Sequence, residues 1–179
     1  MRAVAFFRNL NLGRGTCPSK SQLEQAFIDG GALEATSFLT NGTVVFVGRA
    51  RSTPERVLAR ARQRLRANSG FNEPGFVRTL DSLAHLLTVD PFVDVDRDSV
   101  HECSVTFLHA DARLPRARPG STPRGDVEVL RFTKTEVFCV SRVVGKSPGS
   151  PNAFLEKLLG LPATTRNWNT IVRVVRKFG

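Results

Sequence analysis

Apolar positions in the first half of the chain follow two patterns. Short runs rich in β-branched and aromatic residues predict four strands, near residues 3–7, 34–39, 43–47 and 75–80. Between these runs, apolar side chains recur three and four positions apart, which is the period of an amphipathic helix, over residues 18–31 and 52–70. The Asn41-Gly42 pair separates two strand runs and predicts a tight hairpin.

Both predicted helices carry start signals. In the first helix, Ser21 and Glu24 have the spacing of a capping box. In the second helix, Ser52 or Thr53 serves as the cap before Pro54. The resulting order β-α-β-β-α-β is that of a ferredoxin-like, or split βαβ, unit.

The second half repeats part of this order. After a short helix at 80–87 and an acidic link at 88–100, the pattern predicts strands at 103–109, 127–132 and 136–144 and helices at 151–160 and 167–178. A Pro- and Arg-rich stretch, "LPRARPGSTPRG", stands where the first helix of a second unit would be. We therefore expect an α+β fold of two fused ferredoxin-like units, residues 1–90 and 91–179. The second unit is degraded and has extra C-terminal helices, and the two pack as one compact protein.

The charge of the chain favours anionic partners. The 179 residues carry a net charge of +10, which attracts nucleic acid and phosphorylated ligands. The charge is spread evenly over both halves, and Arg outnumbers Lys, so genomic composition remains an alternative explanation. No apolar run approaches the roughly 20 residues of a membrane span, and no signal peptide is recognisable, so we expect a cytoplasmic protein without a membrane partner.

No cofactor or metal is expected from the pattern of ligand-type residues. The three cysteines are widely separated and form neither a zinc spacing nor a disulfide framework. Asp94, Asp96 and Asp98 alternate as in a calcium loop, but the required Gly and Glu are missing. The three histidines are scattered, and no pair of carboxylates suggests acid–base catalysis, so whether the protein is an enzyme stays open.

The stretch "PATTRNWNT" (162–170) is the most specific feature of the sequence. With Thr164 as the N-cap of the last helix, Ala163 and Trp168 have the spacing of a hydrophobic staple. The free N–H groups of the helix start would then suit a phosphate or carboxylate. The side chains that would help to bind it are Arg166, Asn167, Asn169 and Thr170. The alternative is that the stretch only caps a helix and packs its Trp.

Two Gly-containing loops are weaker candidates for anion binding. "GKS" at 145–147 resembles the end of a phosphate-binding loop but lacks the earlier Gly, which leaves Lys146 and Ser147 as possible oxyanion ligands. The loop after the first strand carries Arg8, Asn11 and Gly13. A base-stacking RNA motif is absent, although the Arg-rich helix at 54–67 could follow a phosphate backbone or be a solvated face.

Four segments spread over nearly the whole chain form a recognisable set: "FFRNLNLGRG", "LTNGTVVF", "VGKSPGSPNAFLEKLLG" and "PATTRNWNT". Through them the chain resembles the bacterial family known as domain of unknown function 1697, and the last segment matches the family's ending residue for residue. Asn9, Asn41 and Thr43 depart from the family pattern. The resemblance implies the fold of two ferredoxin-like units and implies no reaction.

The sequence thus favours a binding module for a phosphorylated small molecule or nucleic acid. One alternative is a structural or protein-interaction role. Another is an enzyme acting on a small anionic substrate, with Lys146 and Arg166 stabilising its charge.

Overall fold

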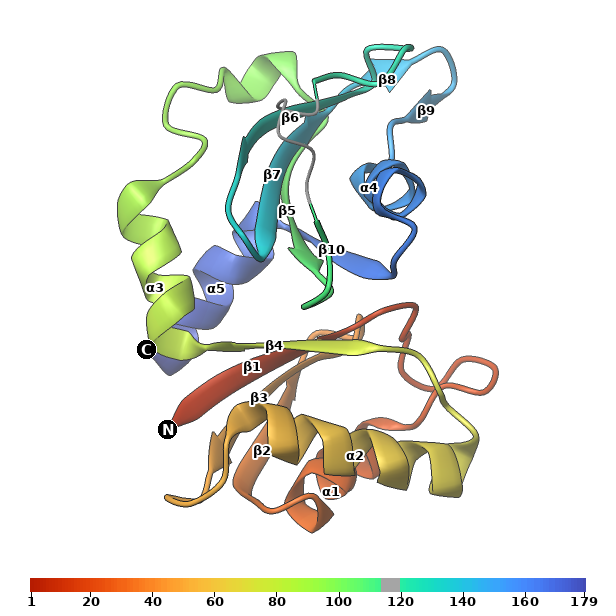
Figure 1. Cartoon of the computed structure of the whole chain (residues 1–179), viewed down its shortest axis with the longest axis vertical. Coiled ribbons are helices and arrows are strands. Elements are labelled where there is room, and N and C mark those ends of the chain that lie inside the picture. The colour runs from red at the N-terminus through yellow and green to blue at the C-terminus, as the bar shows by residue number, and fades with distance from the viewer. Residues whose placement is uncertain (114–119) are drawn as a thin grey trace. The chain divides into compact units, whose positions relative to one another are not determined.

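The chain has a mixed α+β fold that is built from antiparallel sheets and helices (Figure 1). The computed structural model describes residues 1–113 and 120–179. Two units are present: residues 1–84 together with 177–179 form the first, and residues 85–176 form the second. Each unit has its own four-stranded sheet and its own apolar core.

The first unit contains four strands and two covering helices. In chain order these are β1 (Arg2–Phe7), α1 (Lys20–Asp29), β2 (Ala32–Phe38), β3 (Thr43–Gly48), α2 (Pro54–Ser69) and β4 (Gly75–Thr79), followed by α3 (Leu80–Val89). The strands lie in the order β2-β3-β1-β4, and every neighbouring pair is antiparallel. The two helices α1 and α2 cover one face of this sheet (Figure 1).

The core of the first unit lies between the sheet and these helices. Alternate residues of β1, including Ala3, Ala5 and Phe7, pack against the inner stripes of α1 and α2. The Phe7 and Phe27 rings meet edge to face, with centroids 6.0 Å apart. Leu23 and Phe27 of α1 and Leu65 of α2 are almost completely buried, as the helical spacing in the sequence predicts.

The start of α1 differs from the prediction. Ser19, not Ser21, is the N-cap: its side chain accepts from the backbone N–H of Gln22, and the Gln22 side-chain oxygen accepts from the backbone N–H of Ser19 at 2.8 Å. The predicted Ser21/Glu24 pair is wrong because Glu24 is bound elsewhere, accepting from the backbone N–H of Ser37 in β2 at 2.7 Å. The second helix begins as expected, with Thr53 as its cap.

The second unit repeats the strand order of the first. Its elements are η1 (Arg97–Ser99), β5 (Glu102–Leu108), β6 (Val127–Phe132), β7 (Glu136–Ser141), β8 (Val143–Val144), β9 (Ser147–Pro148), α4 (Pro151–Leu159), β10 (Ala163–Asn167) and α5 (Trp168–Phe178). The main sheet has the order β10-β5-β7-β6, again with antiparallel neighbours. Leu155 of α4 packs in the apolar core on one face of this sheet.

The segment before the last helix is a strand, which the sequence pattern did not predict. Residues 163–167 form β10 and pair with β5, so Thr164 is not a helix cap and the predicted staple between Ala163 and Trp168 does not form. The β-branched Thr165 pairs with Thr106 of β5, and their hydroxyl oxygens lie 2.7 Å apart. Helix α5 begins only at Trp168.

Two further differences concern the second unit. The predicted strand at 136–144 ends at Ser141, and residues 143–148 form a separate two-stranded hairpin, β8–β9, that turns at Gly145 and Lys146. The Pro- and Arg-rich stretch at 114–125 lies partly outside the described residues, and no helix occurs in its described part, 120–125.

Within 1–113 and 120–179, none of the helices has the length and apolarity to cross a membrane.

Candidate functional site

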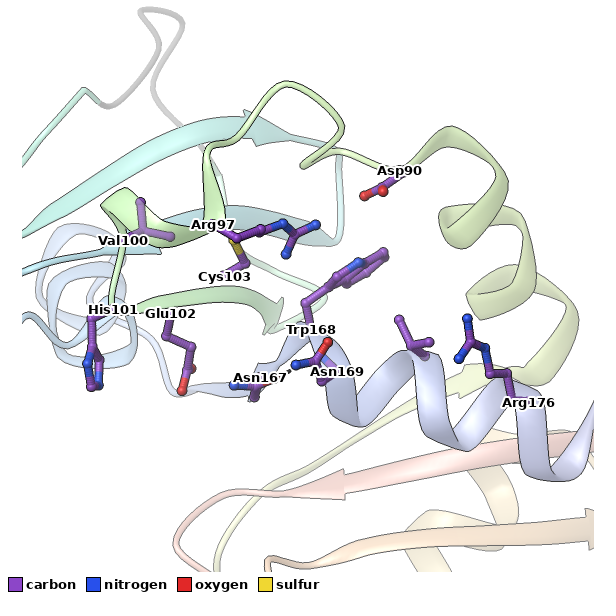
Figure 2. Close-up of a pocket in the computed structure, with 11 residues that line it drawn as sticks. Asp90, Arg97, Val100, His101, Glu102, Cys103, Asn167, Trp168, Asn169 and Arg176 are labelled. Atoms are coloured by element: carbon purple, nitrogen blue, oxygen red, sulfur yellow. Dashed lines mark hydrogen bonds between the residues drawn. The ribbon is translucent and has the colours of Figure 1, made fainter.

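The second unit contains an open cavity of about 480 Å³ at the start of α5 (Figure 2). This volume lies within the range of small-molecule binding sites. The lining residues come from the link after α3, from the start of β5 and from one face of α5: Asp90, Arg97, Val100, His101, Glu102, Cys103, Asn167, Trp168, Asn169, Val172 and Arg176. The wall therefore combines charged and amide side chains with apolar ones.

An aromatic cluster fixes one side of the cavity. Phe92 lies 5.3 Å from Trp168 and 6.0 Å from Phe138, measured between ring centroids, and Phe138 lies 6.2 Å from Trp168. All three pairs meet edge to face, the geometry that the charge distribution of aromatic rings favours. The predicted packing role of Trp168 is confirmed, with the indole only 4% exposed.

A compact turn places Arg97 above this cluster. The carboxylate of Asp90 accepts from the backbone N–H of Phe92 at 3.1 Å, and that of Asp96 accepts from Asp98 at 3.1 Å to start η1. The Arg97 guanidinium carbon lies 5.4 Å from the centroid of the Phe92 ring, within cation–π range. Figure 2 shows the Arg97 and Trp168 side chains directed toward each other.

The start of α5 forms the other side of the cavity. The side-chain oxygen of Asn167 accepts from the backbone N–H of Asn169 at 2.8 Å, as a helix N-cap does. Trp168, Val172 and Arg176 follow at intervals of four residues and so share one face of the helix. The positive end of the α5 dipole therefore lies at the cavity.

The cationic groups of the cavity are not neutralised by ion pairs. Among the described residues, neither Arg97 nor Arg176 forms a salt bridge with a carboxylate. Asp90 and Glu102 also line the cavity, so its fixed charges are two positive and two negative. Such a mixed lining fits a ligand that carries both an anionic group and hydroxyl or amine donors.

The indole N–H of Trp168 is the most informative polar group of the cavity. No described residue accepts a hydrogen bond from this N–H, and it is not among the fully buried side-chain atoms that lack a partner, so it stays accessible although Trp168 as a whole is only 4% exposed. An indole N–H is a hydrogen-bond donor only, and it bonds to protein, water or ligand acceptors. Because Trp168 lines the cavity, a ligand acceptor placed there can supply that partner.

The Cys103 thiol lines the cavity and is a weak nucleophile. Burial raises its pKa above the ordinary value of 9.0, while the neighbouring Arg97 guanidinium partly opposes this rise. The thiol therefore stays protonated at neutral pH, whereas nucleophilic cysteines act as thiolates. The arrangement suits binding better than covalent catalysis.

The structure brings two of the predicted site residues, Asn167 and Asn169, into the cavity wall. Arg166 and Thr170 are buried and do not line the cavity. Arg166 donates to the Thr164 hydroxyl at 2.8 Å and to the Thr165 carbonyl at 2.7 Å, and burial lowers its pKa to about 10. The 162–170 stretch thus combines a sheet strand with one edge of the cavity.

The other predicted ligands lie elsewhere. Lys146 and Ser147 are exposed in the β8–β9 hairpin of the second unit and do not line the cavity. In the first unit, Arg8 forms a 2.8 Å ion pair with Glu73, and Asn11 and Gly13 are exposed in the loop after β1. These predicted ligands therefore belong to two different units.

Several residues of the cavity were not anticipated from the sequence. Arg97 and Asp90 belong to the acidic stretch at 88–100, which has the composition of a solvated linker. The one available signal was Phe92, a large apolar residue inside that acidic stretch, which indicates that the segment is anchored to a core. Sequence spacing alone could not place this segment over Trp168.

The fold is that of an α+β protein with a polar cavity in its second unit. Residues 1–138 match the family described as Protein of unknown function (DUF1697), and the chain belongs to this family. The expected resemblance is therefore confirmed over that span. Residues 139–179, with the 162–170 stretch, lie beyond the matched span.

The chain is also similar to a solved structure, that of the conserved bacterial protein SP0830 from Streptococcus pneumoniae. The TM-score is 0.65 at 17% sequence identity, and the alignment covers 98% of this chain and 97% of that chain. At this identity the similarity shows a common fold and nothing about ligands. No curated protein matches the sequence.

Proposed function

We propose that this protein binds a small phosphorylated molecule in the cavity at the start of α5. The observation that carries the proposal is the Trp168 indole N–H, which has no acceptor among the described residues and lies at the cavity beside the Arg97 guanidinium. Two convergent donors, one of them a cation, match the oxygens of a phosphate group. The positive end of the α5 dipole acts in the same direction.

The carboxylates narrow the class of ligand. Asp90 and Glu102 accept hydrogen bonds and repel a bare polyanion. A phosphate monoester that also carries hydroxyl or amine groups can pair its phosphate with the cationic donors and its hydroxyl or amine groups with the carboxylates. Sugar phosphates and nucleoside monophosphates are such molecules. A volume of about 480 Å³ accommodates a molecule of this size.

The chain offers a direct optical assay for this binding. Trp168 is the only Trp, and the protein contains no Tyr, so the intrinsic emission comes almost wholly from the cavity wall. We would titrate ribose 5-phosphate, nucleoside monophosphates and inorganic phosphate while recording this emission, with the unphosphorylated sugar and nucleosides as controls. A thermal-shift measurement accompanies each titration, because binding to the native state at one hundred times Kd stabilises it by about 2.7 kcal/mol.

Two variants separate specific binding from general charge effects. Arg97→Ala removes a cavity cation, and Arg49→Ala removes an exposed Arg of the first unit outside the cavity. We expect Arg97→Ala to weaken binding about tenfold to one-hundredfold, the loss of one charge-assisted hydrogen bond, and Arg49→Ala to bind as wild type does. If no phosphorylated compound alters the emission, or if both variants weaken binding equally, the proposal is wrong.

We also propose that each unit has the ferredoxin-like topology. In support, the first unit has the order β-α-β-β-α-β with the sheet order β2-β3-β1-β4, and the second has the corresponding sheet order β10-β5-β7-β6.

A cytoplasmic location is proposed as well. It is supported by three free cysteines, Cys17, Cys103 and Cys139, since extracellular proteins tend to pair theirs.

A further inference from the structure

The outer face of α2 carries a row of three arginines. Arg56, Arg60 and Arg64 follow at intervals of four residues, so their side chains project from one side of the helix. All three are exposed, whereas the opposite stripe, Val57, Leu58, Ala61 and Leu65, is buried against the sheet. We call these three residues the α2 arginine row.

The arginine row is electrostatically unfavourable for the isolated protein. Like charges four residues apart on a helix repel each other, and the row contains two such pairs. Arg56 lies in the first turn, where the helix dipole disfavours a positive charge. Glu55 is the one acidic residue of α2, and none of the three arginines forms an ion pair with any described residue.

The surroundings of the row favour an extended anion over a single small one. Arg60 and Arg64 border a recess of about 360 Å³ between α1 and α2, together with Asp29, Gln63 and Ala67. The Asp29 carboxylate accepts from the Gln25 amide at 2.8 Å, and the cationic donors that line the recess are the guanidinium groups of Arg60 and Arg64. Arg56 continues the row beyond the recess toward the start of α2, so three successive anionic groups can be bound.

We propose that the α2 arginine row binds the phosphate backbone of double-stranded DNA without reading its bases. A nucleic-acid strand supplies regularly spaced phosphates, and Arg is suited to phosphate oxygens because its guanidinium can donate two parallel hydrogen bonds. Helix α1 lies beside α2 on the same face of the sheet (Figure 1), so α2 can lie against a strand but cannot enter the major groove alone. Binding is therefore independent of sequence.

This surface belongs to the first unit and is independent of the proposed cavity ligand. We would measure binding of a fluorescently labelled mixed-sequence DNA duplex by anisotropy at several salt concentrations. Three phosphate contacts give a slope of log K against log salt of about −2.7, equivalent to about a 40-fold loss between 50 mM and 200 mM salt.

The test compares two triple variants of equal net charge. Arg56→Gln/Arg60→Gln/Arg64→Gln removes the row, and Arg131→Gln/Lys134→Gln/Lys157→Gln removes three exposed cations of the second unit. Each variant lowers the net charge from +10 by three, to +7. We expect the row variant to lose most of the affinity and to reduce the slope to near zero, and the control variant to keep both.

The proposal has a second readout that protects it from a folding artefact. Because the row variant removes repulsion, its melting temperature should rise, so lost binding cannot be attributed to unfolding. The proposal is overturned if wild type does not bind the duplex at low salt. It is equally overturned if the control variant loses as much affinity as the row variant. A response to heparin or polyphosphate but not to DNA also contradicts it.

Discussion

The guanidinium of Arg166 lies 2.8 Å from the hydroxyl of Thr164, two residues earlier on the same face of β10. Strand geometry sends successive side chains to opposite faces, so Thr165 projects the other way and contacts Thr106 of β5 and Asn152 of α4. Polar side chains on both faces of β10 are therefore engaged within the fold. The part of the 162–170 stretch that remains available to a ligand is its end, at the start of α5.

Arg166→Ala should destabilise the protein rather than abolish ligand binding directly. The change leaves the Thr164 hydroxyl and the Thr165 carbonyl without their charged donor and removes a buried side chain. We expect the free energy of unfolding to fall by about 2–4 kcal/mol. Urea denaturation followed by Trp168 emission measures this.

A matched control is Arg131→Ala on β6, where the side chain is exposed. Its free energy of unfolding should change by less than about 0.5 kcal/mol. Equal denaturation midpoints for the two variants would show that the buried contacts of Arg166 contribute nothing measurable.

Gly42 should tolerate no side chain, although it has nearly the same backbone conformation as Gly70. Both residues have positive φ, +71° and +72°, which costs an L-residue roughly 1–2 kcal/mol. At Gly70 an added Cβ meets open space, but at Gly42 it would lie 2.7 Å from the Leu10 Cβ and 3.1 Å from the Phe7 Cβ. Gly42→Ala should therefore lose about 1–3 kcal/mol more than Gly70→Ala.

Thermal denaturation of the two glycine variants checks this difference. Since the conformational penalty is common to both, the excess measured for Gly42→Ala isolates the steric contact with Leu10 and Phe7. Equal losses would mean that the hairpin shifts to accommodate the methyl group at no cost.

Alkaline pH should weaken the fold through Cys139. Burial raises the pKa of this thiol from 9.0 to about 12, so between these values the unfolded chain releases a proton that the native protein keeps. The unfolded state then binds fewer protons, and the free energy of unfolding falls as pH rises through this window. One such group contributes a slope of about 1.4 kcal/mol per pH unit.

Arg166 acts in the opposite direction, because its lowered pKa of about 10 makes the native state release a proton first above that pH. Measurements are therefore best kept to pH 8–10, where the Cys103 thiol, whose pKa burial also raises, is common to wild type and Cys139→Ala. Urea denaturation at pH 8, 9 and 10 should show a shallower decline for Cys139→Ala than for wild type. Parallel curves would indicate that the thiol does not titrate with unfolding.

Removing the α2 arginine row should stabilise the first unit. Two like-charge pairs and the unfavourable position of Arg56 together predict a gain of about 1 kcal/mol for Arg56→Gln/Arg60→Gln/Arg64→Gln at low salt. The gain should shrink as added salt screens the charges. Calorimetry at low and high salt tests both statements, and a loss of stability at low salt would contradict them.

Local signals in the sequence were enough for most of the fold. The Thr53-Pro54 start of α2 and the bounds of β6 (Val127–Phe132) follow from capping chemistry and alternation, and the structure has them as expected. Strand β10 lacks an apolar pattern, with Thr, Arg and Asn at four of its five positions. Its strand conformation depends on pairing with β5, about sixty residues earlier, which no local pattern encodes.

The cavity was predictable only at its α5 edge. Asn167 and Asn169 follow from the chemistry of a helix start, which acts over a few residues. The position of Arg97 depends on how Phe92 packs against Trp168. This is a tertiary contact between residues 76 positions apart in the sequence. The unpaired indole N–H likewise exists only once that packing is in place.

The same order of four strands in both sheets is the arrangement expected if one ancestral half-length gene was duplicated in tandem. In each copy the last strand passes directly into a helix, β4 into α3 and β10 into α5. After a duplication, each copy can accumulate changes that the other need not accept. The first unit carries a cationic outer helix and the second a polar cavity, so the same strand order supports two surfaces of different chemistry in one polypeptide.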